Sequence, residues 1–360
     1  MWGRARGKPD AHELKLEAAM LVSDVVGTHE SKFSVALAYE DRLKQETERF
    51  ANELEVNNLP AIFHYWSNRY LLPQLQAFGF QHPEHFFETE FASVIRANPG
   101  QLCRFASLGS GNGDAEVRIA QGLLAQGLSA FCIDCLELTP EMNARTTELA
   151  QQSGVAAQVR ALSVDLNSWT PQHTYSAIMA NQSLHHMVEL ERILDTVKPA
   201  LAPEARFLIS DMIGRNGHQR WPEALAIVRE FWNELPDSYR HNLQLNRAEP
   251  EFLDWDCSAE GFEGIRSQDI LALLCERFQF ELFLPFANII DPFIDRSFGH
   301  HFVADGLWDR DFIDRVHARD ELELAKGNIK PTHLIAVLTK TAPTQRRWRA
   351  GFSPEASIRR

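Results

Sequence analysis

The chain has 360 residues, which corresponds to one large domain or two of ordinary size. Apolar residues make up 44% and charged residues 24%, ordinary values for a globular protein that exclude wholesale disorder. The net charge of −13 produces an average surface field that repels polyanions, so we expect neither nucleic acid nor a membrane as partner.

The compartment follows from apolar runs and cysteines. No apolar run exceeds about five residues, whereas a spanning helix needs about twenty and a signal-peptide core at least seven. The five cysteines are an odd number without regular spacing, which is typical of reduced thiols rather than of a disulfide framework. Both observations predict a cytoplasmic protein.

The N-terminal part of the chain has the pattern of amphipathic helices. Apolar residues recur there every three or four positions, as at Leu14, Ala18 and Leu21. We therefore assign residues 1–100 to an N-terminal helical region. An exposed helix in it could pair two subunits in a homodimer.

From residue 102 onward, short apolar runs alternate with helical segments, the pattern of βαβ units and a parallel sheet. The strands are expected at 102–108, 130–136, 157–163, 175–181, 206–211, 279–286 and 332–340. The helices are expected at 114–126, 140–152, 187–201 and 267–277. Two stretches at about 212–265 and 288–330 break the rhythm and are interpreted as insertions. Residues 101–340 are thus assigned to one α/β domain, and 341–360 to a solvated basic tail.

The most informative stretch joins the first strand of this domain to its first helix. It reads Leu108-Gly109-Ser110-Gly111-Asn112-Gly113-Asp114. Alternate glycines permit positive φ and close approach of a ligand, and the helix N-terminus offers free N–H groups. A dinucleotide fold would carry glycine where Asp114 stands, and this carboxylate would repel a pyrophosphate. The loop therefore favours a phosphate-free ligand, and a nicotinamide-dependent dehydrogenase becomes the third hypothesis.

Polar residues follow at the ends of the next three strands. Glu137 ends the second, where a carboxylate can accept from both hydroxyls of a ribose. Asp165 follows the third and can accept from an adenine amino group. Asn181 ends the fourth, at the edge where open α/β sheets bind ligands. Each could instead be a turn residue, but their order and spacing together are far more specific.

With these spacings the chain resembles the class I S-adenosylmethionine-dependent methyltransferases, closely over residues 100–211 and loosely to about 340. The resemblance implies a Rossmann-like sheet of seven strands, parallel but for one, with helical lid insertions. It implies S-adenosyl-L-methionine as cofactor. The cofactor-binding residues that it implies are Gly109, Ser110, Gly111, Gly113, Glu137, Leu138, Asp165, Leu166 and Asn181.

The same resemblance assigns a role to each part of this set. The glycines lie beside the methionine part, Glu137 holds the ribose, Asp165 and Leu166 hold the adenine, and the carbonyl of Asn181 holds the amino group. One departure concerns Ser107, which stands where the family usually carries an acidic residue. That departure puts in doubt how the amino group is anchored.

Transfer of a methyl group depends mostly on alignment, and a base helps a hydroxyl acceptor. His185 and His186 follow the fourth strand and are the candidate catalytic residues, with packing under the cofactor loop as the alternative. His300 and His301, in the second insertion, could reach the same cleft. Aromatic and arginine side chains of the first insertion could form a lid over a planar acceptor, or a helix with a buried apolar stripe.

No metal site is predicted. Cys132 and Cys135 lie three residues apart in a strand and so point to opposite faces. His82, His85 and Glu88 could share one face of a helix, but no second pair of ligands accompanies them.

The sequence therefore predicts an S-adenosylmethionine-dependent methyltransferase that acts on a small-molecule acceptor, with oxygen as the first choice of acceptor atom. Two alternatives remain open. One is a non-catalytic S-adenosylmethionine-binding regulatory or scaffold protein, and the other is a peptide or glycan methyltransferase.

Overall fold

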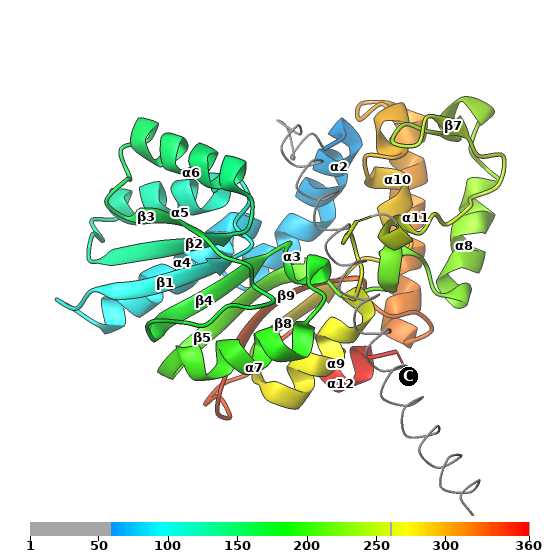
Figure 1. The fold of residues 1–360 in the computed structure, drawn as a ribbon. Coiled ribbons are helices and arrows are strands. Elements are labelled where there is room, and N and C mark those ends of the chain that lie inside the picture. The colour runs from blue at the N-terminus through cyan, green and yellow to red at the C-terminus, as the bar shows by residue number, and fades with distance from the viewer. Residues whose placement is uncertain (1–58, 260, 360) are drawn as a thin grey trace, which may run out of the picture. The chain divides into compact units, whose positions relative to one another are not determined.

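The computed structural model describes residues 59–259 and 261–359 of the chain. The helices expected before residue 59, and the homodimer surface assigned to them, lie outside the described residues. The described part is an α/β structure in which α5 and α6 lie on one face of a large sheet and α7 and α9 on the other (Figure 1). A two-stranded ribbon is separate from this sheet.

The strands and helices have the following bounds. The large sheet contains β1 (Cys103–Leu108), β2 (Phe131–Glu137), β3 (Val159–Ser163), β4 (Tyr175–Asn181), β5 (Leu201–Met212), β8 (Gln279–Phe286), β9 (His333–Thr339) and β10 (Arg347–Trp348). The ribbon pairs β6 (His241–Asn242) with β7 (Arg247–Ala248). The α-helices are α2 (Ala61–Trp66), α3 (Leu72–Ala77), α4 (Pro83–Ala97), α5 (Asp114–Ala125), α6 (Pro140–Gln152), α7 (Leu190–Ala200), α8 (Pro222–Trp232), α9 (Ser267–Arg277), α10 (Asp291–Ile294), α11 (Leu307–Lys326) and α12 (Pro354–Ser357). A π-helical segment, η1 (Ser67–Leu71), joins α2 to α3, and short 3₁₀ turns include η2 (Leu184–His186), η3 (Asn216–His218) and η6 (Gly299–His301).

The strand order is β3-β2-β1-β4-β5-β9-β8-β10. Only β9 runs antiparallel to its neighbours in the sheet, since β5 and β8 both pair with it in that sense. This order begins as a doubly wound sheet does, with a reversal between β1 and β4. The α/β class, the one antiparallel strand and the order of the elements confirm the fold that the resemblance implies.

The strand count is a correction, because the sheet has eight strands where seven were expected. The eighth, β10, comes from residues expected to be a solvated tail. Its Arg347 and Trp348 pair with Leu282 and Phe283 of β8. Trp348 packs against Phe283 and donates its ring N–H to the carbonyl of Phe280, so one partly buried aromatic side chain holds an otherwise polar segment on the sheet edge.

Alternation along the strands divides the core into two layers. Phe105 of β1 packs with the α4 and α5 side chains and stacks on Phe91 at 4.0 Å, whereas Ala106 and Leu108 face α7 and α9. Successive side chains of a strand point to opposite faces, so a doubly covered sheet has apolar residues at nearly every position. The strands near β1 could therefore be predicted from continuous apolar runs.

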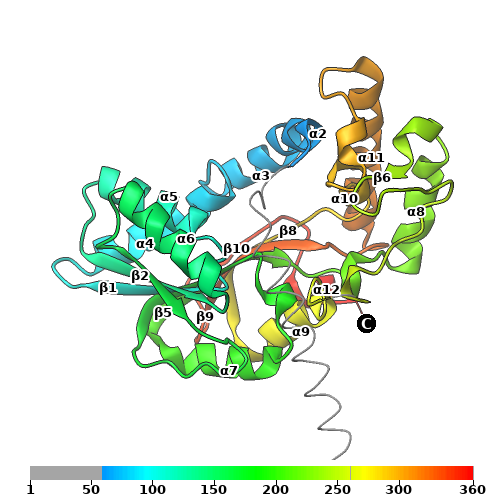
Figure 2. The same cartoon turned by 45° about the horizontal axis from the view of Figure 1, so that its top comes forward.

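The two insertions pack against each other. Trp232 of α8 contacts Phe298 of the second insertion edge to face, and Phe231 meets Phe312 of α11. Arg220 of the first insertion is buried and pairs with Asp291 of α10 at 3.2 Å. Figure 2 shows α8, α10 and α11 gathered together. The buried stripe of α8 bears out the simpler alternative for this segment, a helix with one apolar face.

No helix among the described residues combines the length and apolarity that a bilayer-spanning helix needs.

Candidate functional site

The candidate site lies where the direction of the chain crossovers reverses, between β1 and β4. These two strands are parallel neighbours, and the loops after them leave the same edge of the sheet. Neighbouring loops at such a point diverge to opposite faces and leave a crevice in which ligands of α/β proteins bind. The glycine loop follows β1 there, and η2 with its two histidines follows β4.

Three glycines of the loop after β1 have left-handed backbone conformations, with φ of 65° at Gly109, 56° at Gly111 and 74° at Gly113. At Gly113 a side chain is also excluded by space, since a Cβ would lie 2.5 Å from a methyl group of Thr146. At Gly111 a Cβ would meet nothing within 4 Å. Packing against α6 thus fixes one end of the loop, while its middle borders open space.

Glu137 organises this loop from the end of β2. One carboxylate oxygen accepts the N–H of Gly111 at 3.1 Å, and the other accepts the N–H of Thr139 at 2.9 Å. The side chain is half-buried, and a carboxylate has about four acceptor positions, so hydroxyl donors of a ligand can still bind to it. The structure therefore places Glu137 beside the glycine loop, as the sequence predicted.

The other residues of the predicted cofactor set lie along the same edge. Asp165 accepts the N–H and the side-chain N–H of Asn167, which makes it part of a turn, and Leu166 packs against the α7 and α9 layer. Ser110 and Leu138 lie in the loops after β1 and β2. Asn181 is the last residue of β4, and Gln182 next to it has a φ of 52°, a strained conformation for a residue with a side chain.

The carboxylate that the first strand lacks is supplied by a helix. Ser107 of β1 donates its hydroxyl to Glu116 of α5 at 2.6 Å, and both residues are buried. Burial raises the pKa of Glu116 to about 7, and the hydrogen bond from Ser107 opposes this rise only in part. Sequence analysis missed Glu116, because a single acidic residue in a predicted helix normally faces solvent.

His185 is held between two carboxylates. Its Nδ1 lies 2.6 Å from an oxygen of Asp211 in β5, and its Nε2 lies 3.3 Å from an oxygen of Glu263. Burial by itself lowers the pKa of His185, but the two carboxylates outweigh it and raise the pKa to about 10. The imidazole is therefore protonated at neutral pH in the structure as it stands, which is unsuited to a general base.

Two more imidazoles surround Glu263. His218 of η3 lies 2.7 Å from one oxygen through its Nε2, and His186 lies 3.8 Å from the other oxygen through its Nε2. The side chains of His186 and Glu263 are 25% and 22% exposed, so the group is open on one side. We call His185, His186, His218 and Glu263 the histidine cluster. Burial lowers the pKa of His218, and the neighbouring imidazoles together lower that of Glu263 although its own burial acts in the opposite direction.

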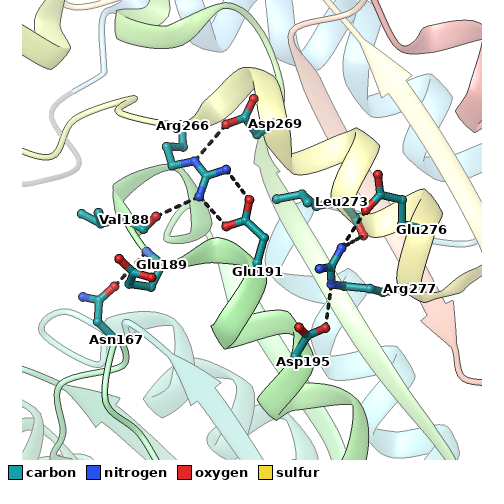
Figure 3. Close-up of polar contacts among 10 residues, drawn as sticks. All are labelled: Asn167, Val188, Glu189, Glu191, Asp195, Arg266, Asp269, Leu273, Glu276 and Arg277. Atoms are coloured by element: carbon teal, nitrogen blue, oxygen red, sulfur yellow. Dashed lines mark hydrogen bonds and ion pairs between the residues drawn. The ribbon is translucent and has the colours of Figure 1, made fainter. Parts of the chain in front are cut away.

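An arginine fixes the segment that carries Glu263. Figure 3 shows Arg266 donating to both oxygens of Glu191 at the start of α7, to Asp269, and to the carbonyl of Val188. The planar guanidinium forms several such bonds with one orientation. Arg266 thereby ties the beginning of α9 to the segment that follows His186, and it fixes the two halves of the histidine cluster relative to each other.

His300 and His301, which were expected to reach the same cleft, lie elsewhere. His300 is exposed, and His301 donates to the carbonyl of His241 in the β6–β7 ribbon. In the N-terminal helices, Trp66 and Tyr70 contact His317 of α11. These contacts are the packing of aromatic side chains between helices.

Sequence analysis predicted the two histidines after β4 but missed their partners. Asp211 could have been recognised as a polar residue at the end of a predicted strand. Glu263 lies 78 positions beyond His185, in a loop without any local motif, and gave no signal. No metal site was predicted, yet His185, His186 and Glu263 offer ligand atoms that all lie within 4.8 Å of one another.

Comparison with known proteins gives structural likenesses only. No protein-family model matches the chain, and no curated protein matches it significantly. An O-methyltransferase of a trans-AT polyketide synthase from Brevibacillus brevis, solved with S-adenosyl-L-homocysteine, is 12% identical with a TM-score of 0.41, over 81% of this chain and 82% of the other. The N-methyltransferase NodS from Bradyrhizobium japonicum, solved with the same compound, is 9% identical with a TM-score of 0.39, over 82% and 97%. A methyltransferase from Geobacter sulfurreducens is 14% identical with a TM-score of 0.39, over 72% and 92%. Likenesses this distant carry no argument about ligand or reaction, which has to come from the site itself.

Replacing Gly113 by alanine tests the packing of the glycine loop. Gly113→Ala adds a Cβ that collides with Thr146, whereas Gly127→Ala has nearly the same φ of 74° and meets nothing within 4 Å. We expect Gly113→Ala to lower the free energy of unfolding by about 1–3 kcal/mol more than Gly127→Ala, the usual cost of overpacking. Urea unfolding of both variants measures the difference, and equal losses would show that Thr146 moves aside freely.

The buried carboxyl of Glu116 makes stability depend on pH. Its pKa of about 7 in the folded chain lies above its ordinary value of 4.5. The stability that it contributes is therefore present below about pH 4.5 and is lost as the pH rises through 7, by up to about 3 kcal/mol. We expect Glu116→Gln to abolish this loss. Between pH 5 and 8 the free energy of unfolding of the variant should therefore rise relative to that of the parent protein. Unfolding at several pH values measures the gain, with the exposed Glu148→Gln as control; parallel profiles for the parent and Glu116→Gln would contradict the assignment.

Proposed function

We propose that the chain is an S-adenosylmethionine-dependent methyltransferase that acts on a small-molecule acceptor and transfers the methyl group to oxygen. The observation that carries the proposal is the pairing of the glycine loop with Glu137 at the point where the crossovers reverse. There the N–H of Gly111 and the carboxylate of Glu137 lie in contact beside open space. A nucleoside whose ribose has free hydroxyls can donate to the remaining acceptor positions of this carboxylate.

The charge at the start of α5 favours S-adenosylmethionine over a dinucleotide. Asp114 is the first residue of α5, so a carboxylate lies where a pyrophosphate would bind, and the buried Glu116 of the same turn is paired with Ser107. The cofactor would carry an ammonium group and a sulfonium, and both are attracted by such carboxyl groups. Ser107 and Glu116 together provide the acidic function that the first strand lacks, and we assign the ammonium group to this side of the loop.

The cofactor supplies an electrophilic methyl group, and this chain supplies position and proton transfer. Ser183, in the loop after β4, packs against Gly109, at 2.9 Å from a Cβ built there. The same loop continues into His185 and His186, so the histidine cluster adjoins the cofactor loop. The space between them is where we place the acceptor, and alignment of acceptor and methyl group accounts for much of the acceleration of a displacement.

An oxygen acceptor suits the cluster because a hydroxyl has to lose a proton. His186 is a partly exposed imidazole beside Glu263 in the loop that follows β4, and we assign it the contact with the acceptor. His185 is buried and paired on both ring nitrogens, so we assign it the role of orienting Glu263 rather than of accepting the proton. The lid formed by the two insertions would select among acceptors.

Calorimetric titration with S-adenosylmethionine, S-adenosylhomocysteine and NAD tests the cofactor. We expect the first two to bind and NAD not to bind. Glu137→Ala should weaken the binding of S-adenosylmethionine about 10- to 100-fold, since hydrogen bonds to a charged group contribute about 1.5–3 kcal/mol. Glu148→Ala, on the exposed side of α6, is the matched control and should bind like the parent protein. Unchanged affinity in a folded Glu137→Ala variant would remove the basis of the proposal.

The acceptor atom is tested by transfer of a labelled methyl group. The protein is incubated with methyl-labelled S-adenosylmethionine and a panel of small hydroxyl, amine and carboxylic acid compounds. We expect labelled methyl ethers or esters, and His186→Ala should lower kcat more than it changes the affinity for S-adenosylmethionine. Label found only in amines would show that the acceptor atom is nitrogen and not oxygen. Binding of the cofactor without any methyl transfer would favour a non-catalytic binding protein.

A further inference from the structure

We propose that the histidine cluster is a binding site for a divalent transition-metal ion of the zinc or iron(II) class, with His185, His186 and Glu263 as ligands. Their ligand atoms lie within 4.8 Å of one another although Glu263 is distant in sequence. Two imidazoles and one carboxylate are a common ligand set for zinc and for non-haem iron(II). The inference stands on this geometry and does not depend on the proposed function.

His185 is already oriented as a metal ligand. A carboxylate oxygen of Asp211 lies 2.6 Å from the Nδ1 of His185. Asp211 is itself fixed, because it accepts the N–H groups of Ser183 and Leu184 at 3.0 and 2.7 Å. A carboxylate that holds the far nitrogen of an imidazole is the usual second layer around a metal-binding histidine, because it sets the tautomer and the ring orientation. The Nε2 of His185 is thereby directed at Glu263.

Glu263 is held by a strained turn and a clamp. His218, which lies 2.7 Å from its carboxylate, has a φ of 54°, an unfavourable conformation for a residue with a side chain. Gly264 has a φ of 65° and suits the close approach of this turn, since a Cβ there would lie 3.1 Å from the N atom of Gly217. Arg266 fixes the other end of the segment (Figure 3). The strained turn at His218 and the contacts of Arg266 both hold the segment that carries the Glu263 carboxylate, which indicates a pre-organised site.

Charge and access also fit a cation. Asp211 and Glu263 bring two carboxylates to one small group of imidazoles. Nitrogen ligands favour a transition metal over magnesium or calcium, which prefer oxygen. The side chains of His186 and Glu263 are about a quarter exposed, so an ion can enter and keep open coordination positions.

An ion at this site would adjoin the glycine loop, because Ser183 links the two through its contact with Gly109. A hydroxyl or carboxylate oxygen of a second ligand could then bind at an open position of the ion. Metal binding would lower the pKa of a bound hydroxyl. With the ion present, His186 would act as its ligand, and the ion would polarise the acceptor in place of the imidazole.

The test titrates chelator-treated full-length protein with Co²⁺, by visible absorption and calorimetry, followed by Zn²⁺ in competition. We expect one Co²⁺ per chain with absorption typical of nitrogen and oxygen ligands, displaced by Zn²⁺. His186→Ala and Glu263→Gln should weaken binding more than tenfold, and Asp211→Asn by about 10- to 100-fold as an outer partner. Should the Asp211→Asn variant fail to fold, the His186→Ala variant carries the test, because the side chain of His186 is partly exposed.

The controls separate this site from other histidines. His300→Ala removes an exposed histidine of the second insertion, and His85→Ala removes the helical pair of His82 and His85. Both should bind Co²⁺ like the parent protein. Loss of binding in His85→Ala with retention in His186→Ala, or no binding in the parent protein, would overturn the inference and leave an ion-paired network. The cofactor titration runs on the same samples, so metal binding without S-adenosylmethionine binding would contradict the proposed function alone.

Discussion

A single buried carboxylate, that of Asp211 at the end of β5, determines the path of the loop after β4. It accepts the N–H groups of Ser183 and Leu184 and the imidazole of His185, all within 3.0 Å. An ion buried without such partners would cost several kcal/mol, so the loop must bring its donors to this point. The same path presses Ser183 against Gly109 and allows no side chain there. The glycine loop and the histidine cluster are therefore neighbours because one anchored loop contacts both.

The fold could largely be predicted because its signals are local. Continuous apolar runs and glycine or proline punctuation located the strands and helices of the α/β domain to within a few residues, apart from a longer β5 that begins at Leu201. The eighth strand could not be predicted in this way. β10 is two residues long and lies in a basic segment, and it joins the sheet through Trp348 packing on Phe283. Such a contact depends on tertiary structure and leaves no periodic pattern in the sequence.

The candidate site also has one part that local sequence signals predict and one part that they do not. The residues proposed to bind the cofactor lie at strand ends and in the glycine loop. Their order along the chain predicts that they lie close together once a parallel sheet is assumed. The histidine half of the site requires Glu263, and nothing near that residue predicts a site. The missing acidic residue of β1 shows the difference most clearly, since Glu116 supplies a carboxyl to Ser107 from nine positions along the chain. A carboxyl group placed in this way is near the strand in space but is not part of a motif along the chain.

The topology also explains why both insertions can serve the site. The first leaves the end of β5 and returns at the start of α9, and the second leaves the end of β8 and returns at the start of antiparallel β9. All four junctions therefore lie at the edge that carries the glycine loop. Three of them are joined to one another, since the N–H of Ile213 after β5 donates to Thr332 before β9, and that of Thr332 donates to Ala287 after β8. Changes within either insertion can then alter the surroundings of the glycine-loop edge while the strands below keep their register.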